Sequence, residues 1–128
     1  MLLIIAIVII LIEAIGEGLL KRFDTGINEI LFDDWIQWVI AVMFGCVFLI
    51  VAFNFTGYFV PVWKIISGFV FVRFAIFDVM WNLARGVKWN YYGTTKWYDR
   101  VMFELGEFGW MLKGISGIIG VIFLLGYE

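Results

Sequence analysis

The chain has 128 residues, of which 64% are apolar, 20% are aromatic and only 16% are charged, and its net charge is -2. An average soluble domain is about half apolar and about a quarter charged, so this composition excludes an ordinary soluble protein. One Cys and no His exclude an intramolecular disulfide and a zinc site of the usual Cys/His kind, and the charge offers no basic field for nucleic acid.

Four stretches are long and apolar enough to cross a bilayer as helices, which takes about 20 mostly apolar residues. They run over residues 2–20, 35–53, 61–82 and 110–127. Their continuous apolar character excludes barrel strands, in which apolar and polar residues alternate over about 10 residues. The first stretch lacks the basic start and the Ala-x-Ala pattern of a signal peptide, so we expect it to be retained as a helix.

A fifth helix is predicted over residues 96–108, ahead of the last stretch. Trp97, Val101, Leu105 and Phe108 recur there at helical spacing. Much of the remaining surface is charged: Lys96, Asp99, Arg100, Glu104 and Glu107. Such an amphipathic helix lies on the membrane or docks on a partner. The sequence therefore predicts an all-α integral membrane protein, a single domain of four transmembrane helices plus a short interfacial amphipathic helix.

Basic residues and tryptophans concentrate on one side of this arrangement. With four spans, loops 21–34 and 84–109 share a side, and they hold six of the nine basic residues. The positive-inside tendency places both loops in the cytoplasm and both termini outside. We expect the membrane to be a bacterial inner membrane or a viral membrane. Six tryptophans near the loops are predicted interfacial anchors: Trp35, Trp38, Trp81, Trp89, Trp97 and Trp110.

Charged residues inside the spans are costly and usually face the protein interior, where they pair or contact water. Glu13 lies 11 residues after Leu2, and Arg73 lies 12 residues after Pro61. At about 1.5 Å per residue the two lie at similar depth, so we predict that they pair across a helix interface. A second polar cluster is expected nearer the cytoplasm: Glu17, Lys21, Asp78, Asn82 and Arg85. These charges either fix the register of the helices or line a route for protons or ions.

Small residues recur in the last span. Gly114, Gly117 and Gly120 are spaced by three, and Ser116 and Gly120 are spaced by four. Small residues let helix backbones approach closely in lipid, so we predict a tight helix contact here, within one chain or between chains.

One segment carries a recurring pattern. Arg73-Phe74-Ala75-Ile76-Phe77-Asp78 leads to Trp81-Asn82 and Arg85-Gly86, and then to Tyr91-Tyr92-Gly93-Thr94-Thr95 and Asp99. This segment, about a quarter of the chain, resembles uncharacterised small multi-pass membrane proteins of bacteria and phages. The resemblance implies no activity, but it implies that Asp78, Asn82, Gly93 and Asp99 form one local unit. Independently, Gly86 permits a turn after a helix, and Asp99 or Asn82 could satisfy backbone donors in that turn.

Residues for catalysis are hard to find. No His is present, Ser67 and Ser116 have no base nearby in sequence, and no phosphate-binding loop or CxxC motif occurs. We therefore expect no catalytic residue, cofactor or metal, and no enzyme activity. The leading interpretation is a non-catalytic structural or accessory component of a membrane oligomer or larger complex, with the lipid bilayer and further copies or other membrane proteins as partners. The alternative is a homo-oligomeric pore, an ion or proton channel or a phage holin-like protein, lined by Glu13, Glu17 and Arg73.

Overall fold

The computed structural model describes residues 1–22, 34–56, 61–92 and 97–126. These residues form five helices and are all-α, as predicted: α1 (Leu2–Arg22), α3 (Asp34–Thr56), α4 (Val62–Ala84), α5 (Trp97–Leu105) and α6 (Glu107–Leu125). Three of the helices in the described ranges are long and apolar enough to cross a membrane, namely α1, α3 and α6. The fourth long helix, α4, is not among them, and it contains three charged residues.

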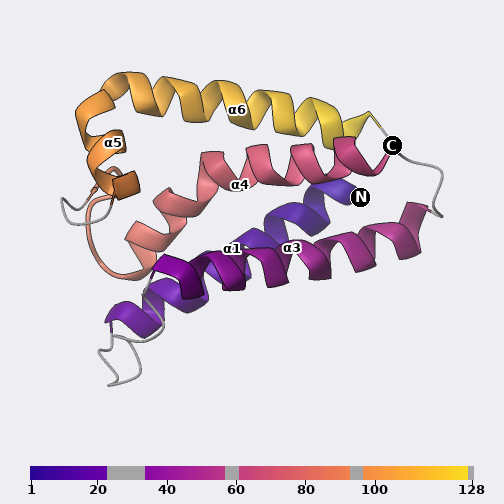
Figure 1. The fold of residues 1–128 in the computed structure, drawn as a ribbon, viewed down its shortest axis with the longest axis horizontal. Coiled ribbons are helices and arrows are strands. Elements are labelled where there is room, and N and C mark those ends of the chain that lie inside the picture. Colours follow the sequence, from indigo (N-terminus) through magenta and orange to yellow (C-terminus); the bar gives the residue numbers. More distant parts are fainter. Residues whose placement is uncertain (23–33, 57–60, 93–96, 127–128) are drawn as a thin grey trace.

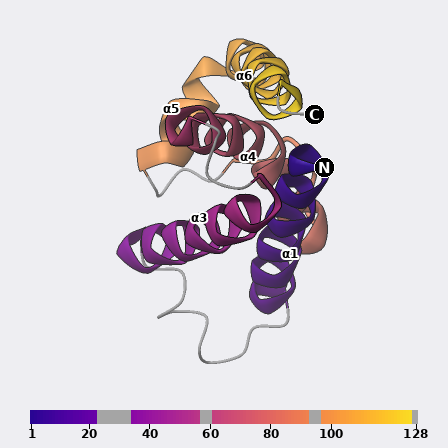
Figure 2. The ribbon, with the colours of Figure 1, turned by 90° about the vertical axis from the view of Figure 1, so that its right-hand side faces the viewer.

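Helix α4 is the centre of the arrangement. It packs mainly against α6 on one side and α1 on the other, whereas α3 lies beside α1 and makes few contacts with α4 (Figure 1). Viewed from the end of the bundle, α6, α4 and the α1–α3 pair form successive layers (Figure 2). The helices run back and forth, so that α1 and α4 end, and α3 and α6 begin, at the same end of the bundle (Figure 1). We call this end, where α5 also lies, the α5 end.

The apolar core occupies the half of the bundle away from the α5 end. Its buried residues come from all four long helices: Leu2, Ala6, Ile10, Phe48, Ala52, Ile65, Phe69, Val72 and Leu124. The rings of Phe48 and Phe69 stack with their centroids 4.5 Å apart, which joins α3 to α4. No polar side chain belongs to this core cluster among the residues that the structure describes.

Small residues set the distance between α4 and α6. A Cβ atom on Gly120 would lie 2.8 Å from the carbonyl oxygen of Gly68, and one on Gly117 would lie 3.0 Å from Cβ of Ala75. Ser116 Oγ donates a hydrogen bond of 3.2 Å to the carbonyl oxygen of Phe71. Three of the four residues predicted for packing therefore lie in this contact. Gly114 does not, because a Cβ atom there would meet no neighbouring atom of the chain.

Two glycines with positive φ shape the α5 end. Gly86 (φ 82°) ends α4 as predicted: its N–H bonds to the carbonyl of Leu83, and the N–H of Val87 bonds to the carbonyl of Asn82. This pair of bonds is the Schellman motif. Gly106 (φ 54°) separates α5 from α6. Gly106 lies within the helix predicted over residues 96–108, so that helix ends at Leu105, and α6 begins at Glu107, three residues before the predicted span.

Helix α5 docks through a face other than its predicted apolar stripe. Met102 is buried and Tyr98 is half-buried against the bundle, whereas the predicted stripe of Trp97, Val101, Leu105 and Phe108 is exposed. The predicted first residue of this helix, Lys96, lies outside the described residues. The exposed stripe leaves apolar side chains on the outer surface of the α5 end.

Candidate functional site

A buried ion pair lies where α4, α5 and α6 meet. Lys113 on α6 is only 2% exposed, and its Nζ lies 2.5 Å from Oδ2 of Asp78 on α4. The same ammonium donates to the carbonyl oxygen of Phe74 at 2.9 Å and to the hydroxyl of Tyr98 at 3.0 Å. A lysine has three N–H donors, and here all three have acceptors within the protein. We call Asp78, Lys113 and the two tyrosines described next the polar centre.

Two tyrosine hydroxyls complete the polar centre. Tyr98 on α5 donates to Asp78 Oδ2 at 2.7 Å, and Tyr92, from the segment after α4, donates to the same atom at 3.1 Å. Burial, together with the negative charge of Asp78, raises the pKa of both tyrosines above the ordinary value. Both hydroxyls therefore stay protonated and remain donors at neutral pH. One carboxylate oxygen thus joins α4, α5, α6 and the segment after α4.

Aromatic rings surround the Lys113 ammonium. Its Nζ lies 4.4 Å from the ring centroid of Phe74 and 5.5 Å from that of Trp110. The rings of Trp110 and Tyr92 are 5.5 Å apart, and Trp89 packs edge-on against Trp110 at 4.9 Å. Such rings attract a cation through their faces, which adds to the attraction between Lys113 and Asp78.

Asn82 organises the segment that follows α4. It is 1% exposed, and its Nδ2 donates to the carbonyl oxygens of Trp89 (2.9 Å) and Tyr91 (2.8 Å). Asn82 or Asp99 was expected to satisfy backbone donors, whereas these two bonds of Asn82 satisfy backbone acceptors. Its Oδ1 accepts a bond from Arg85 Nη2 at 3.2 Å. Arg85 in turn lies 4.0 Å from the ring centroid of Trp81 and 4.9 Å from that of Tyr91.

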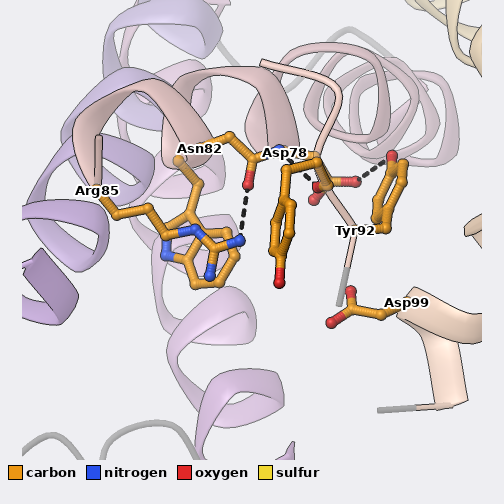
Figure 3. Close-up of a pocket in the computed structure, with 7 residues that line it drawn as sticks. Asp78, Asn82, Arg85, Tyr92 and Asp99 are labelled. Carbon is orange, nitrogen blue, oxygen red and sulfur yellow. Dashed lines mark hydrogen bonds between the residues drawn. The ribbon is translucent and has the colours of Figure 1, made fainter. Parts of the chain in front are cut away.

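A small pocket opens beside the polar centre (Figure 3). Its lining residues come from α4, from the segment after it and from α5: Asp78, Trp81, Asn82, Arg85, Tyr91, Tyr92 and Asp99. Three of the four residues that the resemblance groups into one unit are therefore together, and the fourth, Gly93, lies outside the described residues. Glu17 and Lys21, predicted for the same cluster as Asp78, do not line the pocket; on α1, Glu17 is half-buried and Lys21 is exposed.

A second ion pair joins α1 to α4. Arg73 binds Glu13 through two hydrogen bonds, Nη2 to Oε1 at 2.6 Å and Nε to Oε2 at 3.1 Å. The Glu13 side chain is fully buried and that of Arg73 is 26% exposed. The guanidinium also lies 4.1 Å from the ring centroid of Phe77. The predicted pair between Glu13 and Arg73 is therefore confirmed.

The predicted anchor tryptophans fall into two groups. Trp38, Trp89 and Trp97 are exposed. Trp81 and Trp110 are half-buried and pack against Arg85 and Tyr92, so they also support the polar residues. The side chain of Trp35 lies outside what the structure describes.

The sequence analysis missed three members of the polar centre: Lys113, Tyr92 and Tyr98. A signal for Lys113 was available, because it is the only charge in the predicted fourth span and a charge inside a span needs a partner. Tyr92 and Tyr98 gave no such signal, since tyrosines are common near membrane interfaces.

No known protein family matches this chain, and no curated protein or solved structure matches it either. Within the described ranges, no three side chains of His, Cys, Asp or Glu gather in a way that could hold a metal ion. The described contacts of the polar centre are charge pairing and hydrogen bonds that join α4, α5 and α6.

Proposed function

We propose that this chain is a membrane protein of four spans, α1, α3, α4 and α6, that acts without catalysis as a structural or accessory component of a membrane oligomer or larger complex. In this proposal α4 crosses the membrane despite its charges, because Arg73 and Asp78 have partners on neighbouring helices. A paired charge facing the protein interior is the usual form in which ionisable residues occur within a bilayer.

The observation that carries the proposal is that each of the two ion pairs joins α4 to a neighbouring helix. Glu13–Arg73 ties α1 to α4, and Asp78–Lys113 ties α6 to α4. The Glu13 carboxylate is closed between two helices, and Lys113 is enclosed by aromatic rings. Groups held in this way favour a role in fixing helix positions over a role in lining an ion path.

The same arrangement supports a proposal for the orientation of the chain. The basic last turn of α1 and the end of α4, which is capped by Arg85, lie together at the α5 end, while the N-terminus and the end of α6 lie at the other (Figure 1). We propose that the α5 end faces the cytoplasm and that both termini are outside. In this orientation the exposed apolar stripe of α5 meets the bilayer surface, as an interfacial helix does.

The partner surface would come from the outer face of α3. This helix has only two side chains in the apolar core, Phe48 and Ala52. Seven of its large apolar side chains are exposed, among them Trp38, Met43 and Ile50. Lipid or another membrane helix can cover such a face at little cost.

The test is the mass and composition of the particle that is extracted gently from its native membrane. We expect the chain in a complex of fixed stoichiometry, and liposomes that contain it should show no flux of protons or ions. A second protein at a fixed ratio would identify the role through the partner.

The contrary outcome is a pure homo-oligomer that conducts. Glu13→Gln and Glu17→Gln would then abolish the flux. Lys64→Gln, which removes a charge in the first turn of α4, is the control and would leave the flux intact. This result would show that the protein is a pore and that the structural proposal is wrong.

A further inference from the structure

The last turns of α1 and α4 lie directly against each other at the α5 end. Gly18 makes this possible, since a Cβ atom there would lie 2.6 Å from Cβ of Ala84 and 2.8 Å from the carbonyl oxygen of Trp81. The contact brings the basic last turn of α1, which contains Lys21 and Arg22, beside the turn that follows α4.

The turn after α4 leaves room for the Arg22 guanidinium. Gly86 lies in this turn, and a Cβ atom on it would lie 3.6 Å from both Cζ and Nε of Arg22. Lys88 follows two residues later and, like Arg22, is exposed. Glu17, one helical turn before Lys21, offsets part of the Lys21 charge. Arg22 ends α1 and Lys88 follows α4, so this helix junction presents both cations to the outside, next to the exposed Lys21.

The junction lies at the level of the exposed tryptophans. Trp38 is in the first turns of α3, Trp89 follows α4 and Trp97 begins α5, and all three are exposed at this end. Tryptophans mark the headgroup level of a membrane protein. Basic pockets between transmembrane helices bind anionic headgroups there, and guanidinium groups bind phosphate through two parallel hydrogen bonds.

We propose that the junction of α1 and α4 binds the phosphate of an anionic lipid headgroup through Arg22 and Lys88. The inference rests on the membrane insertion proposed above, and it adds a ligand to it. The lipid would come from the leaflet at the α5 end, and it would neutralise the cations that the ends of α1 and α4 bring together.

The test compares two lipid probes in vesicles of phosphatidylcholine that contain the full chain. Electron paramagnetic resonance measures how much spin-labelled phosphatidylglycerol or spin-labelled phosphatidylcholine is motionally restricted by the protein. We expect a preference for phosphatidylglycerol. Arg22→Gln and Lys88→Gln should each lower that preference by up to about fivefold, the contribution of one basic side chain near a membrane surface.

Two control variants remove one positive charge elsewhere. Arg100→Gln alters an exposed arginine of α5, which lies away from the end of α1 (Figure 1), and Lys64→Gln alters the opposite end of α4. Both should retain the preference. An equal loss in Arg100→Gln, or no preference in the wild-type protein, would overturn the site while leaving the proposed function intact. If neither probe is restricted, the chain does not enter the bilayer, and the proposed function falls together with the site.

Discussion

The two halves of α4 are held by different kinds of contact. From Val62 to Val72 the helix packs through apolar side chains and through the close approach of Gly68 to Gly120. From Arg73 to Ala84 its contacts include two ion pairs and the hydrogen bonds of Asp78 and Asn82. The ion pairs of α4 begin at Arg73, near the middle of the helix.

The difference shows which half fixes the helix positions. In lipid, apolar contacts between helices have no hydrophobic driving force, because the lipid tails are as apolar as the side chains. A displaced apolar helix exchanges one apolar neighbour for another. A displaced polar half leaves a charge buried without its partner, which is strongly unfavourable. If the bundle lies in lipid as proposed, we expect the polar half to determine the register and the apolar half to contribute close packing.

The most damaging single change should be Lys113→Met, in the polar half. It leaves Asp78 facing two tyrosines without a cation, and breaking a buried pair in this way costs about 3–5 kcal/mol. The free energy of unfolding in detergent micelles measures the loss. Lys64→Met, at the other end of the bundle, removes the same charge and should cost less than about 1 kcal/mol. Similar losses of unfolding free energy in the two variants would show that the contacts of the polar half are not the stronger ones.

Arg73→Leu should destabilise the protein by about 2–3 kcal/mol, because it leaves the Glu13 carboxylate buried without its partner. The loss should be smaller than for Lys113, since Arg73 donates the two hydrogen bonds to Glu13, whereas Lys113 donates three hydrogen bonds. The double variant Glu13→Leu with Arg73→Leu should recover part of the stability. Unchanged assembly and stability in Arg73→Leu alone would show that the pair does not hold α1 to α4.

The packing of the apolar half can be tested by enlarging a side chain instead of removing a charge. Gly120→Leu would place side-chain atoms against the backbone of α4, so it should cost about 1–3 kcal/mol in the same unfolding assay. Gly114→Leu makes the same replacement six residues earlier, where a Cβ atom would meet nothing within 4 Å. This variant should leave the free energy of unfolding nearly unchanged. Equal effects would mean that α6 does not contact α4 through Gly120.

The two tyrosines of the polar centre should make the stability of the protein depend on pH in the alkaline range. In the unfolded chain a tyrosine loses its proton near pH 10. The folded protein retains the protons of Tyr92 and Tyr98, because burial and Asp78 raise their pKa. The unfolded state then binds fewer protons, so stability should fall as the pH rises above about 10, by up to about 1.4 kcal/mol per pH unit for each tyrosine. Tyr98→Phe should make this slope shallower; a slope equal to that of the wild type would contradict the assignment.

Helices and local turns were accessible from the sequence. Apolar length located the long helices to within a few residues, and Gly86 marked the end of α4. The Glu13–Arg73 pair was also predictable, because the constant rise of a helix converts sequence position into depth.

The polar centre was not accessible in the same way. Asp78 and Lys113 are 35 residues apart, and their meeting depends on how the segment after α4 folds back. Asn82 was predicted for this cluster, but its bonds to the carbonyl oxygens of Trp89 and Tyr91 were not. The contact of Tyr98 with Asp78 was also missed, because it is made through a hydroxyl and a hydrophobic pattern does not register hydrogen bonds.

The most direct test of the claim that ion pairing fixes α6 on α4 is a double-mutant cycle with Asp78→Asn, Lys113→Met and the combined variant. The free energies of unfolding of the four proteins give the coupling between the two side chains. We predict a coupling of at least about 1.5 kcal/mol. The double variant should therefore lose less stability than the two single variants lose together. Additive losses, with a coupling near zero, would contradict it.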